Sequence, residues 1–508
     1  MDLNNRVIIV GAGNAALCAA ISARENGAEV LVLERAPKEL RGGNSAFTAG
    51  AMRVAYEDAD GLRHLMPDLT EEELQATDFG SYSQERFYDD ISRVTEYRAD
   101  PDLADLLVSE SMPTMRWMRT HGVRFLPIYG RQAFKVDGKF TFWGGLTVEA
   151  RGGGPGLVET LCAEAERMGI EIRYGTEAIG LERGDEGIKG VRVRAAGGSV
   201  EVLPARAVVL AAGGFQANPE WRTRYLGPGW DLAKVRGTRF NTGGGIRIGL
   251  EVGAAPAGNW SGCHAVGWER NAPEFGDLEV GDGFQKHSYP FGIMVNSDGK
   301  RFVDEGADFR NYTYAKYGRR VLEQPQQFAW QIFDQKVTHL LRDEYRIRQV
   351  TKVTANSLEE LAHKLDGVDP SAFLETIDEY NGAVQAEVPF NPNLKDGRRT
   401  TGLAVNKSNW ANTIDEGPFE AYQITCGITF TFGGLRVDTL GRALDESERP
   451  IPGLYVAGEM AGGLFYFNYP GGSGLTYGAV LGKRAGATAA AHVAAQTVVP
   501  AAHGSASM

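Results

Sequence analysis

The sequence predicts an α/β fold in which a Rossmann-type domain is interrupted by an inserted α+β domain. Three observations predict this fold. Residues 7–35 read as an apolar strand, a glycine turn, a helix and a second apolar strand. A strand, a turn and a long helix return from residue 453 onward. Between residues 258 and 425 the alternation of strands and helices is lost and Trp, His and Tyr become frequent, which indicates a separate domain.

The first of these segments is a nucleotide-binding fingerprint in its structural context. Residues 7–10 are wholly apolar, as expected for a parallel strand that is buried on both faces. Gly11 permits a tight turn, Gly13 lets a phosphate approach the backbone, and the small Ala16 allows the following helix to pack closely. Glu34, at the end of the second strand, can accept hydrogen bonds from a ribose 2′-hydroxyl. That acid disfavours a 2′-phosphate, which argues against NADP.

Further glycine motifs indicate that the nucleotide is FAD. An ordinary βαβ unit can carry glycines in its turn, but a strand, helix and acid in register favour nucleotide binding. Residues 41–45, Arg-Gly-Gly-Asn-Ser, suit a second set of phosphate contacts, which an extended FAD needs. Residues 471–476 open a helix whose N-terminus would face the flavin ring. The predicted FAD contacts are Gly11, Gly13, Asn14, Ala15, Ala16, Glu34, Arg35, Gly42, Gly43, Asn44, Ser45, Thr48, Gly50, Ala178, Ala212, Gly213, Gly458, Glu459, Ser473, Gly474 and Leu475.

Composition excludes several classes of protein. The net charge of −12 argues against nucleic acid as a partner. No apolar run approaches the length of a membrane span, and residues 1–10 lack the features of a signal peptide, so we expect a cytoplasmic protein that reaches a membrane only through a partner. The four cysteines are scattered without metal-ligand spacing, which predicts no metal site and a core-packing role for Cys18.

Between the two nucleotide-binding segments, the pattern predicts a helical layer and then more of the Rossmann-type domain. Residues 51–145 are expected to be mostly helical. The series that follows is typical of this kind of FAD domain and would bring the backbone around Ala178 to the adenine end. Helices are predicted at 71–74, 86–96, 101–117, 157–168 and 241–252, strands at 170–174 and 207–210, and a hairpin at 187–193 and 199–203.

The inserted region is predicted to cover the flavin and hold the substrate, because ligands commonly bind at domain interfaces. Two helices are expected within it, at 358–365 and 371–385. The predicted domain limits are 1–257 for the first part of the FAD-binding domain, 258–425 for the capping domain, and 426–508 for the second part.

Six segments along the chain carry a family resemblance: VGAGNAALCAA, RGGNS, GNWSGCHAVGWE, GKRFVDEGADFRNYTYAKYG, TFTFGGLRV and YPGGSGLTYGAVLG. Together they resemble the FAD-dependent tricarballylate dehydrogenases, within the flavoprotein group of fumarate reductases and succinate dehydrogenases. The likeness covers nearly the whole chain. Its terminal motifs are shared by many flavoproteins, whereas its middle segments are much more specific.

The resemblance implies a mobile capping domain and hydride transfer between flavin N5 and a C–C bond next to a carboxylate. In fumarate reductases an arginine after a motif like that of residues 299–305 serves as the proton donor. The matching residue is Arg310, in a stretch that is one residue longer than usual. The histidine that anchors a substrate carboxylate matches His264.

Two departures from the family pattern concern the second carboxylate anchor. The family's second histidine falls at Phe430 or Thr431, and its second arginine falls at Tyr469. Half of the fumarate clamp is therefore missing, which argues against simple fumarate or succinate chemistry. Tyr469 and Tyr289 are candidates to donate hydrogen bonds instead. A tyrosine-lined flavin site also resembles 3-ketosteroid dehydrogenases, which makes them the alternative within this group.

The residue chemistry agrees with these assignments but leaves alternatives open. An arginine binds a carboxylate well and is a poor base, because its pKa exceeds 12. Arg310 therefore needs burial and a proton relay, for which Asp304, Glu305 and Asp308 are nearby acids. A surface ion pair with Asp308 is the alternative for Arg310. For His264 the alternative is a hydrogen-bonded histidine at the domain boundary.

The leading hypothesis is an FAD dehydrogenase that desaturates a small polycarboxylate such as tricarballylate and passes electrons to a separate acceptor. The resemblance implies a membrane-bound iron–sulfur or haem protein as that acceptor. Residues 43–48 contain no histidine that could bind flavin covalently as in some family members, so the FAD is predicted to be non-covalent. The alternatives are a ketosteroid-type dehydrogenase with an apolar substrate, a fumarate reductase-like enzyme, and a flavin-binding module without turnover of its own.

Overall fold

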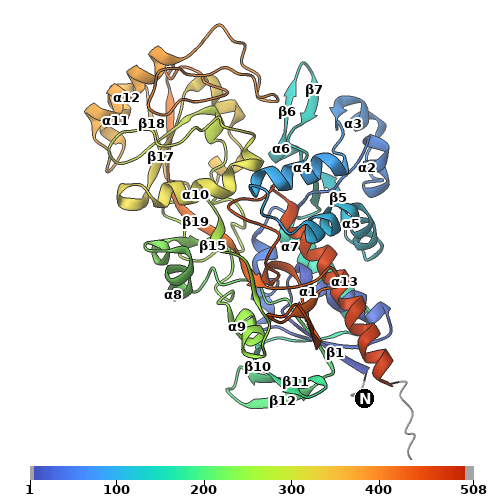
Figure 1. The fold of residues 1–508 in the computed structure, drawn as a ribbon. Coiled ribbons are helices and arrows are strands. Elements are labelled where there is room, and N and C mark those ends of the chain that lie inside the picture. Colours follow the sequence, from blue (N-terminus) through green and yellow to red (C-terminus); the bar gives the residue numbers. More distant parts are fainter. Residues whose placement is uncertain (1–4, 498–508) are drawn as a thin grey trace, which may run out of the picture.

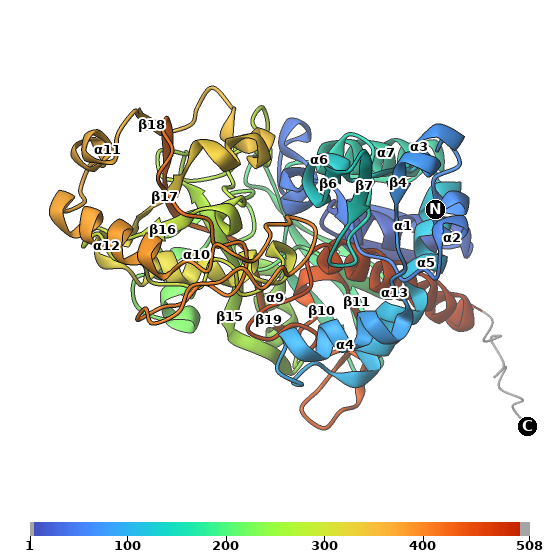
Figure 2. The same ribbon diagram turned by 90° about the horizontal axis from the view of Figure 1, so that it is seen from above.

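The computed structural model describes residues 5–497. They form two lobes that lie against each other (Figures 1 and 2). Two long antiparallel strands, β15 (Pro256–Glu269) and β19 (Phe419–Leu435), run from one lobe into the other. The first lobe contains both ends of the described chain. The second lobe is formed mainly by the residues between these two strands.

A six-stranded sheet with the order β20–β21–β13–β1–β2–β9 forms the centre of the first lobe. Its inner strands are parallel, with Ile8 of β1 opposite Val208 of β13 and Leu31 of β2, and only the edge strand β20 is antiparallel. Residues 7–9 are fully buried because both faces of the sheet are covered, as their apolar run predicts. The strands are β1 (Arg6–Val10), β2 (Glu29–Leu33), β9 (Glu171–Arg173), β13 (Ala207–Leu210), β20 (Arg442–Leu444) and β21 (Pro450–Val456).

Helices α1 (Asn14–Glu25) and α13 (Ser473–Thr497) pack against each other although they lie at opposite ends of the sequence. Gly482 makes the close crossing possible, because a Cβ atom there would lie 2.3 Å from the Ala15 carbonyl oxygen. The Asn14 side-chain amide donates a hydrogen bond to the Leu475 carbonyl oxygen at 2.8 Å. The N-termini of both helices therefore lie together, beside the carboxyl end of β1.

The rest of the first lobe is a helical layer with three small sheets. The predicted helices and the predicted hairpin are all present, but residues 51–150 also contain short strands that helical periodicity did not predict, because strands of two to four residues show no measurable period. The helices are α2 (Ala59–Leu65), α3 (Glu71–Ala76), α4 (Gln84–Val94), α5 (Pro101–Thr120), α6 (Tyr129–Gln132), α7 (Gly153–Arg167), α8 (Pro219–Trp221) and α9 (Gly244–Glu251). The small sheets consist of β3 (Ala51–Met52), β8 (Val148–Ala150) and β5 (Phe125–Pro127); β4 (Thr77–Asp78), β7 (Lys139–Phe142) and β6 (Ala133–Val136); and β10 (Thr176–Gly184), β11 (Gly187–Ala195) and β12 (Val200–Pro204).

The second lobe is an α+β layer with hydrophobic clusters of its own. Its sheet has the order β14–β19–β17–β16, and β15 and β18 pair with β19. The predicted domain limits at 257 and 425 fall within β15 and β19. Its remaining elements are β14 (Lys234–Val235), β16 (Ile293–Val295), β17 (Ala329–Phe333), β18 (Lys352–Ala355), α10 (Tyr314–Leu322), α11 (Leu358–Lys364) and α12 (Pro370–Ala383).

Two further observations concern the surface and the core. Among residues 5–497, none of the helices combines the length and the apolar character that crossing a membrane requires. Cys18 is fully buried in the core of the first lobe, as predicted. The predicted FAD-binding domain also includes residues 1–4 and 498–508, which lie outside the described residues.

Candidate active site

Two connected chambers extend from the central sheet to the interface between the lobes. The glycine-lined chamber follows the carboxyl ends of β1, β2 and β13 and contains Gly11, Gly13 and Gly213. The arginine-lined chamber lies between the lobes and contains the side chains of Arg131, Arg236 and Arg310. The chambers share the lining residues Asn14, Ala15, Asn44, Ser45, Gly458 and Glu459, so together they form one elongated cavity.

The turn between β1 and α1 shapes the glycine-lined chamber. Gly11 has a φ of +109°, and a Cβ atom there would lie 2.4 Å from the Ala211 carbonyl oxygen. Its backbone N–H donates to the Leu33 carbonyl oxygen at 2.8 Å, which fixes the turn against β2. The Ser45 hydroxyl accepts the Asn14 backbone N–H at 3.1 Å, so the second glycine motif folds over the start of α1. Only glycine fits at position 11 without displacing the neighbouring strand.

Two charged side chains lie at the far end of the same chamber. The Glu34 carboxylate accepts the backbone N–H groups of Ala12 at 2.9 Å and Ala36 at 2.7 Å. Burial raises the pKa of Glu34, and these two hydrogen bonds oppose the shift. Arg35 donates to the Phe240 carbonyl oxygen at 3.0 Å and forms an ion pair of 3.5 Å with Glu177.

Most residues predicted to contact FAD line this cavity. Three do not, for identifiable reasons. Ala16 is fully buried on the inner side of α1, Gly50 packs against the backbone of Gly153, and the Ser473 hydroxyl bonds to the Pro470 carbonyl oxygen. The predicted residues in the glycine-lined chamber are Gly11, Gly13, Asn14, Ala15, Glu34, Arg35, Gly42, Gly43, Asn44, Ser45, Ala178, Ala212, Gly213, Gly458 and Glu459. Thr48, Gly474 and Leu475 line the arginine-lined chamber.

The cavity fits an extended dinucleotide. Its glycine-lined part offers backbone N–H groups at the N-terminus of α1, which is a favourable place for a pyrophosphate. The Glu34 carboxylate lies on the same wall and can accept a hydrogen bond from a ribose hydroxyl. Gly474 and Leu475, at the start of α13, line the arginine-lined part, where a planar ring system would extend toward the second lobe.

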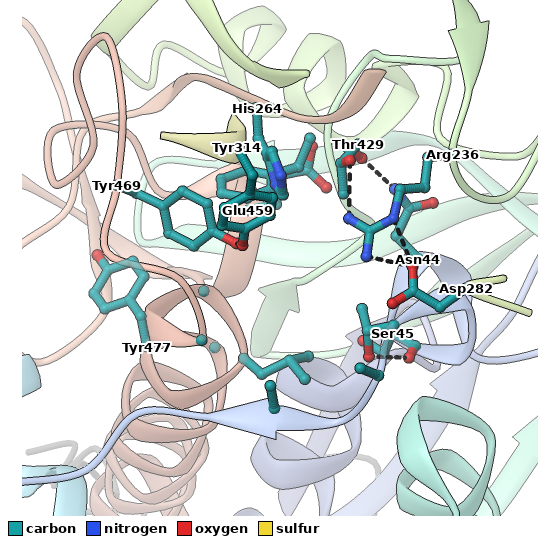
Figure 3. Close-up of a pocket in the computed structure, with 18 of the residues that line it drawn as sticks. Asn44, Ser45, Arg236, His264, Asp282, Tyr314, Thr429, Glu459, Tyr469 and Tyr477 are labelled. Carbon is teal, nitrogen blue, oxygen red and sulfur yellow. Dashed lines mark hydrogen bonds and ion pairs between the residues drawn. The ribbon is translucent and has the colours of Figure 1, made fainter. Parts of the chain in front are cut away.

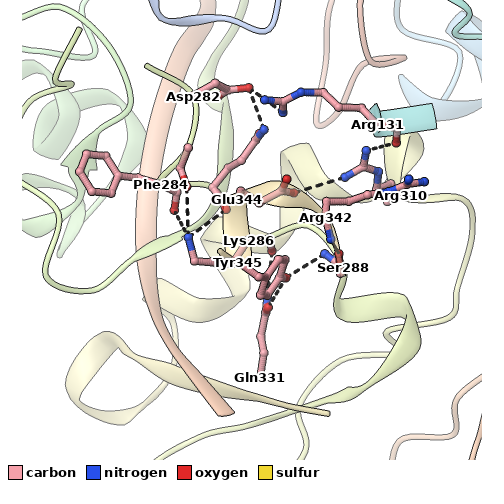
Figure 4. Close-up of polar contacts among 12 residues, drawn as sticks. Arg131, Asp282, Phe284, Lys286, Ser288, Arg310, Gln331, Arg342, Glu344 and Tyr345 are labelled. Atoms are coloured by element: carbon pink, nitrogen blue, oxygen red, sulfur yellow. Dashed lines mark hydrogen bonds and ion pairs between the residues drawn. The ribbon is translucent and has the colours of Figure 1, made fainter. Parts of the chain in front are cut away.

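An ion-pair network crosses the interface at the polar end of the arginine-lined chamber (Figures 3 and 4). Arg236 donates to Oδ1 of Asp282 from Nε at 2.8 Å and from Nη2 at 2.5 Å. The other oxygen of Asp282 accepts Arg131 Nη1 at 3.0 Å and Gln285 Nε2 at 2.7 Å. Arg236 also donates to the Thr429 hydroxyl at 3.1 Å. Arg131 thus comes from the first lobe, whereas Arg236, directly after β14, and the carboxylate that holds both arginines come from the second.

Arg310 lies in this chamber and is buried, with 7% of its surface exposed. Its Nη2 donates to the backbone carbonyl oxygen of Arg131, and its Nη1 lies 3.7 Å from Oε1 of Glu344 (Figure 4). The alternative of an ion pair with Asp308 is wrong, because Asp308 pairs with Arg93 at 2.8 Å and Lys395 at 3.5 Å. Burial lowers the pKa of Arg310, and the Glu344 carboxylate opposes that shift.

The acid beside Arg310 is therefore not one of the three that the sequence suggested. Glu305 is held by Arg301, and Asp304 accepts the hydroxyl and the backbone N–H of Ser408. Glu344 comes from the 3₁₀ turn Asp343–Tyr345, more than thirty residues along the chain.

His264 also lines the arginine-lined chamber, and neither of its ring nitrogens has a hydrogen-bond partner in the described chain. Its ring lies 4.9 Å from Tyr314, 5.3 Å from Phe430 and 4.9 Å from Tyr469, measured between ring centroids. Burial lowers the pKa of His264 well below its ordinary value, and Arg236 adds to the shift. The alternative of a histidine hydrogen-bonded within the protein is therefore wrong, and the lowered pKa favours the neutral ring.

The tyrosines expected near the flavin differ in position. The Tyr469 hydroxyl bonds to the Tyr314 hydroxyl, and both side chains line the chamber beside His264 (Figure 3). Tyr289 was a candidate anchor, and this is wrong, because its hydroxyl pairs with Thr313 Oγ1 at 2.6 Å and the side chain does not line the chamber. Phe430 and Thr431, at the position of the missing family histidine, do line it.

Several polar residues of the arginine-lined chamber were not identified from the sequence. The important ones are Arg131, Arg236, Asp282 and His287, which come from α6, the segment after β14 and the loop after β15. Each stands in a segment without a spacing motif. The only local signal was a charged residue in a glycine-containing stretch, such as Lys-Val-Arg-Gly at 234–237, and that pattern is common on protein surfaces.

Three comparisons with known proteins bear on this cavity. Residues 6–475 match the model of a family described as FAD binding domain. A fumarate reductase (cytochrome) of Shewanella frigidimarina is 29% identical over 488 residues, which cover 95% of this chain and 76% of the relative. A 3-oxosteroid 1-dehydrogenase of Mycolicibacterium smegmatis is 26% identical over 570 residues, which cover 96% of this chain and 98% of the relative. The structure of a flavocytochrome c3 fumarate reductase in its open conformation superposes with a TM-score of 0.71 at 25% identity, covering 96% of this chain and 78% of that one.

Proposed function

The chain belongs to the FAD binding domain family and is an FAD-dependent oxidoreductase of the fumarate reductase and succinate dehydrogenase group, and we propose that it desaturates a C–C bond next to a carboxylate. The observation that carries this proposal is the arginine-lined chamber. Three arginines line it, at the end of a cavity shaped for an extended flavin nucleotide. Buried arginines are the side chains best suited to bind a carboxylate through two parallel hydrogen bonds.

The residues of the glycine-lined chamber would hold the FAD. The start of α1 and the second glycine motif would bind the pyrophosphate, Glu34 the ribose, and the backbone at Ala178 the adenine end. When bound, FAD supplies an acceptor for a hydride at its N5 atom. We propose that it is bound non-covalently, since residues 43–48 offer no histidine. Yellow flavin released on acid denaturation supports this, and flavin that precipitates with the chain contradicts it.

The second lobe would position the substrate. His264, neutral and without a protein partner, can donate a ring N–H to a carboxylate without adding charge. Arg310 is the proposed proton acceptor in desaturation and the proton donor in the reverse reaction. A guanidinium must be deprotonated to accept a proton, and burial lowers the pKa of Arg310 in that direction.

The proposed substrate is a small polycarboxylate such as tricarballylate. The sequence resembles tricarballylate dehydrogenases, and a chamber lined by several arginine and histidine side chains would suit a polycarboxylate. Anaerobic titration of the holoenzyme tests it: tricarballylate should bleach the flavin absorbance. If succinate alone bleaches it, or fumarate alone reoxidises the reduced flavin, the fumarate reductase-like alternative is preferred.

A second candidate is a dehydrogenase with an apolar, ketosteroid-like substrate. The specific observation in its favour is an aromatic wall of the arginine-lined chamber, formed by Phe430, Phe432, Phe465, Tyr469 and Tyr477. The 26% identical 3-oxosteroid 1-dehydrogenase agrees with it. Bleaching by a 3-ketosteroid and by no carboxylate would establish this candidate. A flavin that none of these compounds bleaches would leave only a flavin-binding module without turnover.

The electrons removed from the substrate would leave through a separate acceptor. The relative from Shewanella is named fumarate reductase (cytochrome), which supports a haem protein in that role. A membrane-bound iron–sulfur or haem protein is what the family resemblance implies. The acceptor is identified by following reoxidation of the bleached holoenzyme with a soluble cytochrome and with membrane fractions in parallel.

A further inference from the structure

The second carboxylate anchor of the substrate is missing from the positions where the family places it. Phe430 and Tyr469 stand there, and neither carries a positive charge. We propose that Arg131 and His287 together bind a second carboxylate, so that the chamber selects di- or tricarboxylates over monocarboxylates. This inference rests on the proposed function, and it assigns that function a specificity site.

Arg131 faces the chamber from the lobe opposite Arg310. It belongs to the short helix α6 of the first lobe, whereas Arg310 begins the turn Arg310–Tyr312 of the second lobe. The hydrogen bond from the Arg310 side chain to the backbone carbonyl oxygen of Arg131 holds the two residues next to each other (Figure 4). Two carboxylates of one small molecule can therefore meet two guanidinium groups that come from different lobes.

The Arg131 guanidinium retains hydrogen-bonding capacity. Within residues 5–497 the only side-chain hydrogen bond of this guanidinium runs from Nη1 to Asp282, and a guanidinium carries five N–H groups. The side chain is 26% exposed, in contrast to 7% for Arg236. Arg236 donates two hydrogen bonds to Asp282 and one to Thr429, so few of its N–H groups remain to bind a ligand. Arg131 is therefore the ligand-binding member of the pair, and Arg236 is a positioning residue.

Asp282 does not neutralise the chamber. Its two oxygens already accept four hydrogen bonds, from Arg236, Arg131 and Gln285. Asp282 therefore orients the side chains of the two arginines. At the polar end of the chamber, Asp282 and Glu344 are the two carboxylates beside the three guanidinium groups; Glu459, the other acid that lines the chamber, lies where the two chambers join. The local excess of positive charge is what an additional carboxylate would offset.

His287 supplies the second donor. Only 5% of its surface is exposed, it lines the chamber, and its Nε2 atom has no hydrogen-bond partner in the described chain. Its ring packs edge-on against Tyr314 at a centroid distance of 4.8 Å, which fixes its orientation. Burial lowers the pKa of His287 well below its ordinary value, with Arg310, Arg236 and Arg131 adding to the shift. A neutral imidazole among three arginines can donate its N–H to a carboxylate without adding repulsion.

The test compares two unreactive probes on the oxidised holoenzyme by titration calorimetry. Malonate carries two carboxylates on a single carbon and cannot be desaturated, and acetate is its monocarboxylate counterpart. The wild type should bind malonate more tightly than acetate. Arg131→Gln should weaken malonate binding about 10- to 100-fold, the range expected for a lost hydrogen bond to a charged group, and leave acetate binding nearly unchanged.

His287→Leu provides an independent variant, and it should weaken malonate binding in the same selective way. The matched control is Arg124→Gln, an exposed arginine outside the chamber whose ion pair with Asp68 is on the surface. In steady-state assays with tricarballylate, Arg131→Gln should raise KM far more than it lowers kcat. Flavin content and melting temperature establish that each variant is folded.

Two results would overturn this inference while leaving the proposed function intact. One is a wild type that binds malonate no better than acetate although tricarballylate bleaches its flavin. The other is an Arg131→Gln variant that loses affinity for both probes equally or for neither. If no carboxylate bleaches the wild-type flavin, the proposed function itself fails, and that outcome is read from the flavin spectrum and not from the calorimeter.

Discussion

The two chambers of the cavity are built in different ways. The walls of the glycine-lined chamber are mostly backbone and come from turns that directly follow strands of one sheet. The arginine-lined chamber is walled by long side chains from both lobes, and its network is closed where Asp282 and Arg236 of the second lobe meet Arg131 of the first. A chamber walled by backbone tolerates few substitutions, but its shape does not depend on how the two lobes meet. A side-chain wall permits many substitutions and depends on how the lobes meet.

This difference predicts the largest effect for a glycine of the backbone wall. Gly11→Val should abolish FAD binding, because its Cβ would lie 2.4 Å from the Ala211 carbonyl oxygen and its φ is +109°. The φ penalty alone costs about 1–2 kcal/mol, which corresponds to about 5- to 30-fold in affinity, and the clash with Ala211 adds to it. The flavin-to-protein ratio after purification measures it.

Gly27→Ala is the matched control, since Gly27 also has a positive φ of +86° but a Cβ there meets nothing within 4 Å. It should keep its FAD. A Gly11→Val protein that is as yellow as the wild type would show that the backbone of this turn does not set the shape of the chamber.

The next largest effect is expected in the side-chain wall. Arg310→Gln should slow flavin reduction by the substrate about 10²- to 10⁴-fold, the usual range for a lost acid–base group, and leave the FAD content unchanged. Stopped-flow absorbance under anaerobic conditions measures the rate. Arg320→Gln, in which an exposed arginine of α10 is replaced, should react like the wild type. Normal reduction in the Arg310 variant would remove it from the mechanism.

Replacing Asp282, which holds Arg131 and Arg236, should lower the free energy of unfolding. Asp282→Asn leaves Arg236 and Arg131 without their shared charge partner, and breaking a buried ion pair costs about 3–5 kcal/mol. Chemical denaturation of the variant and of the exposed Glu279→Gln control compares their free energies of unfolding. Equal stability of the two variants would mean that the network is not a structural support.

How far each chamber could be predicted from the sequence follows from the same difference. Gly11, Gly13 and Glu34 stand at fixed distances along the chain, so local spacing was sufficient to place them on one wall. The central sheet was predictable for the same reason, because β1, β2 and β13 are short apolar runs followed by glycine.

The rest depended on tertiary packing. Residues 131, 236 and 282 are separated by tens of residues and share no motif, so only the meeting of the lobes brings them together. Arg310 was placed by family resemblance, but its acidic neighbour Glu344 comes from a turn that no local pattern connects to it. The short strands of residues 51–150 escaped prediction because they form by pairing with each other and not by their own periodicity.

The smallest expected effect lies where the chambers join. Glu459 lines both chambers, and burial raises the pKa of its carboxyl to about 7. The folded state therefore binds the proton more tightly than the unfolded state, so this group's contribution to stability is present below about pH 4.5 and is lost as the pH rises through about 7.

Glu459→Gln should remove that loss. The melting temperature of the apoprotein should fall less between pH 5 and pH 8 in this variant than in the wild type, whereas the exposed Glu446→Gln should behave like the wild type. Identical pH profiles for all three proteins would contradict the raised pKa.

The most direct measurement is an anaerobic titration of the purified holoenzyme with tricarballylate, followed at the same time by flavin absorbance and by NMR of the carboxylate. Loss of the yellow absorbance should be accompanied by one equivalent of the unsaturated tricarboxylate for each flavin reduced. An unchanged spectrum with tricarballylate and every other carboxylate, in a protein that retains its FAD and is bleached by a 3-ketosteroid, would contradict the proposed reaction.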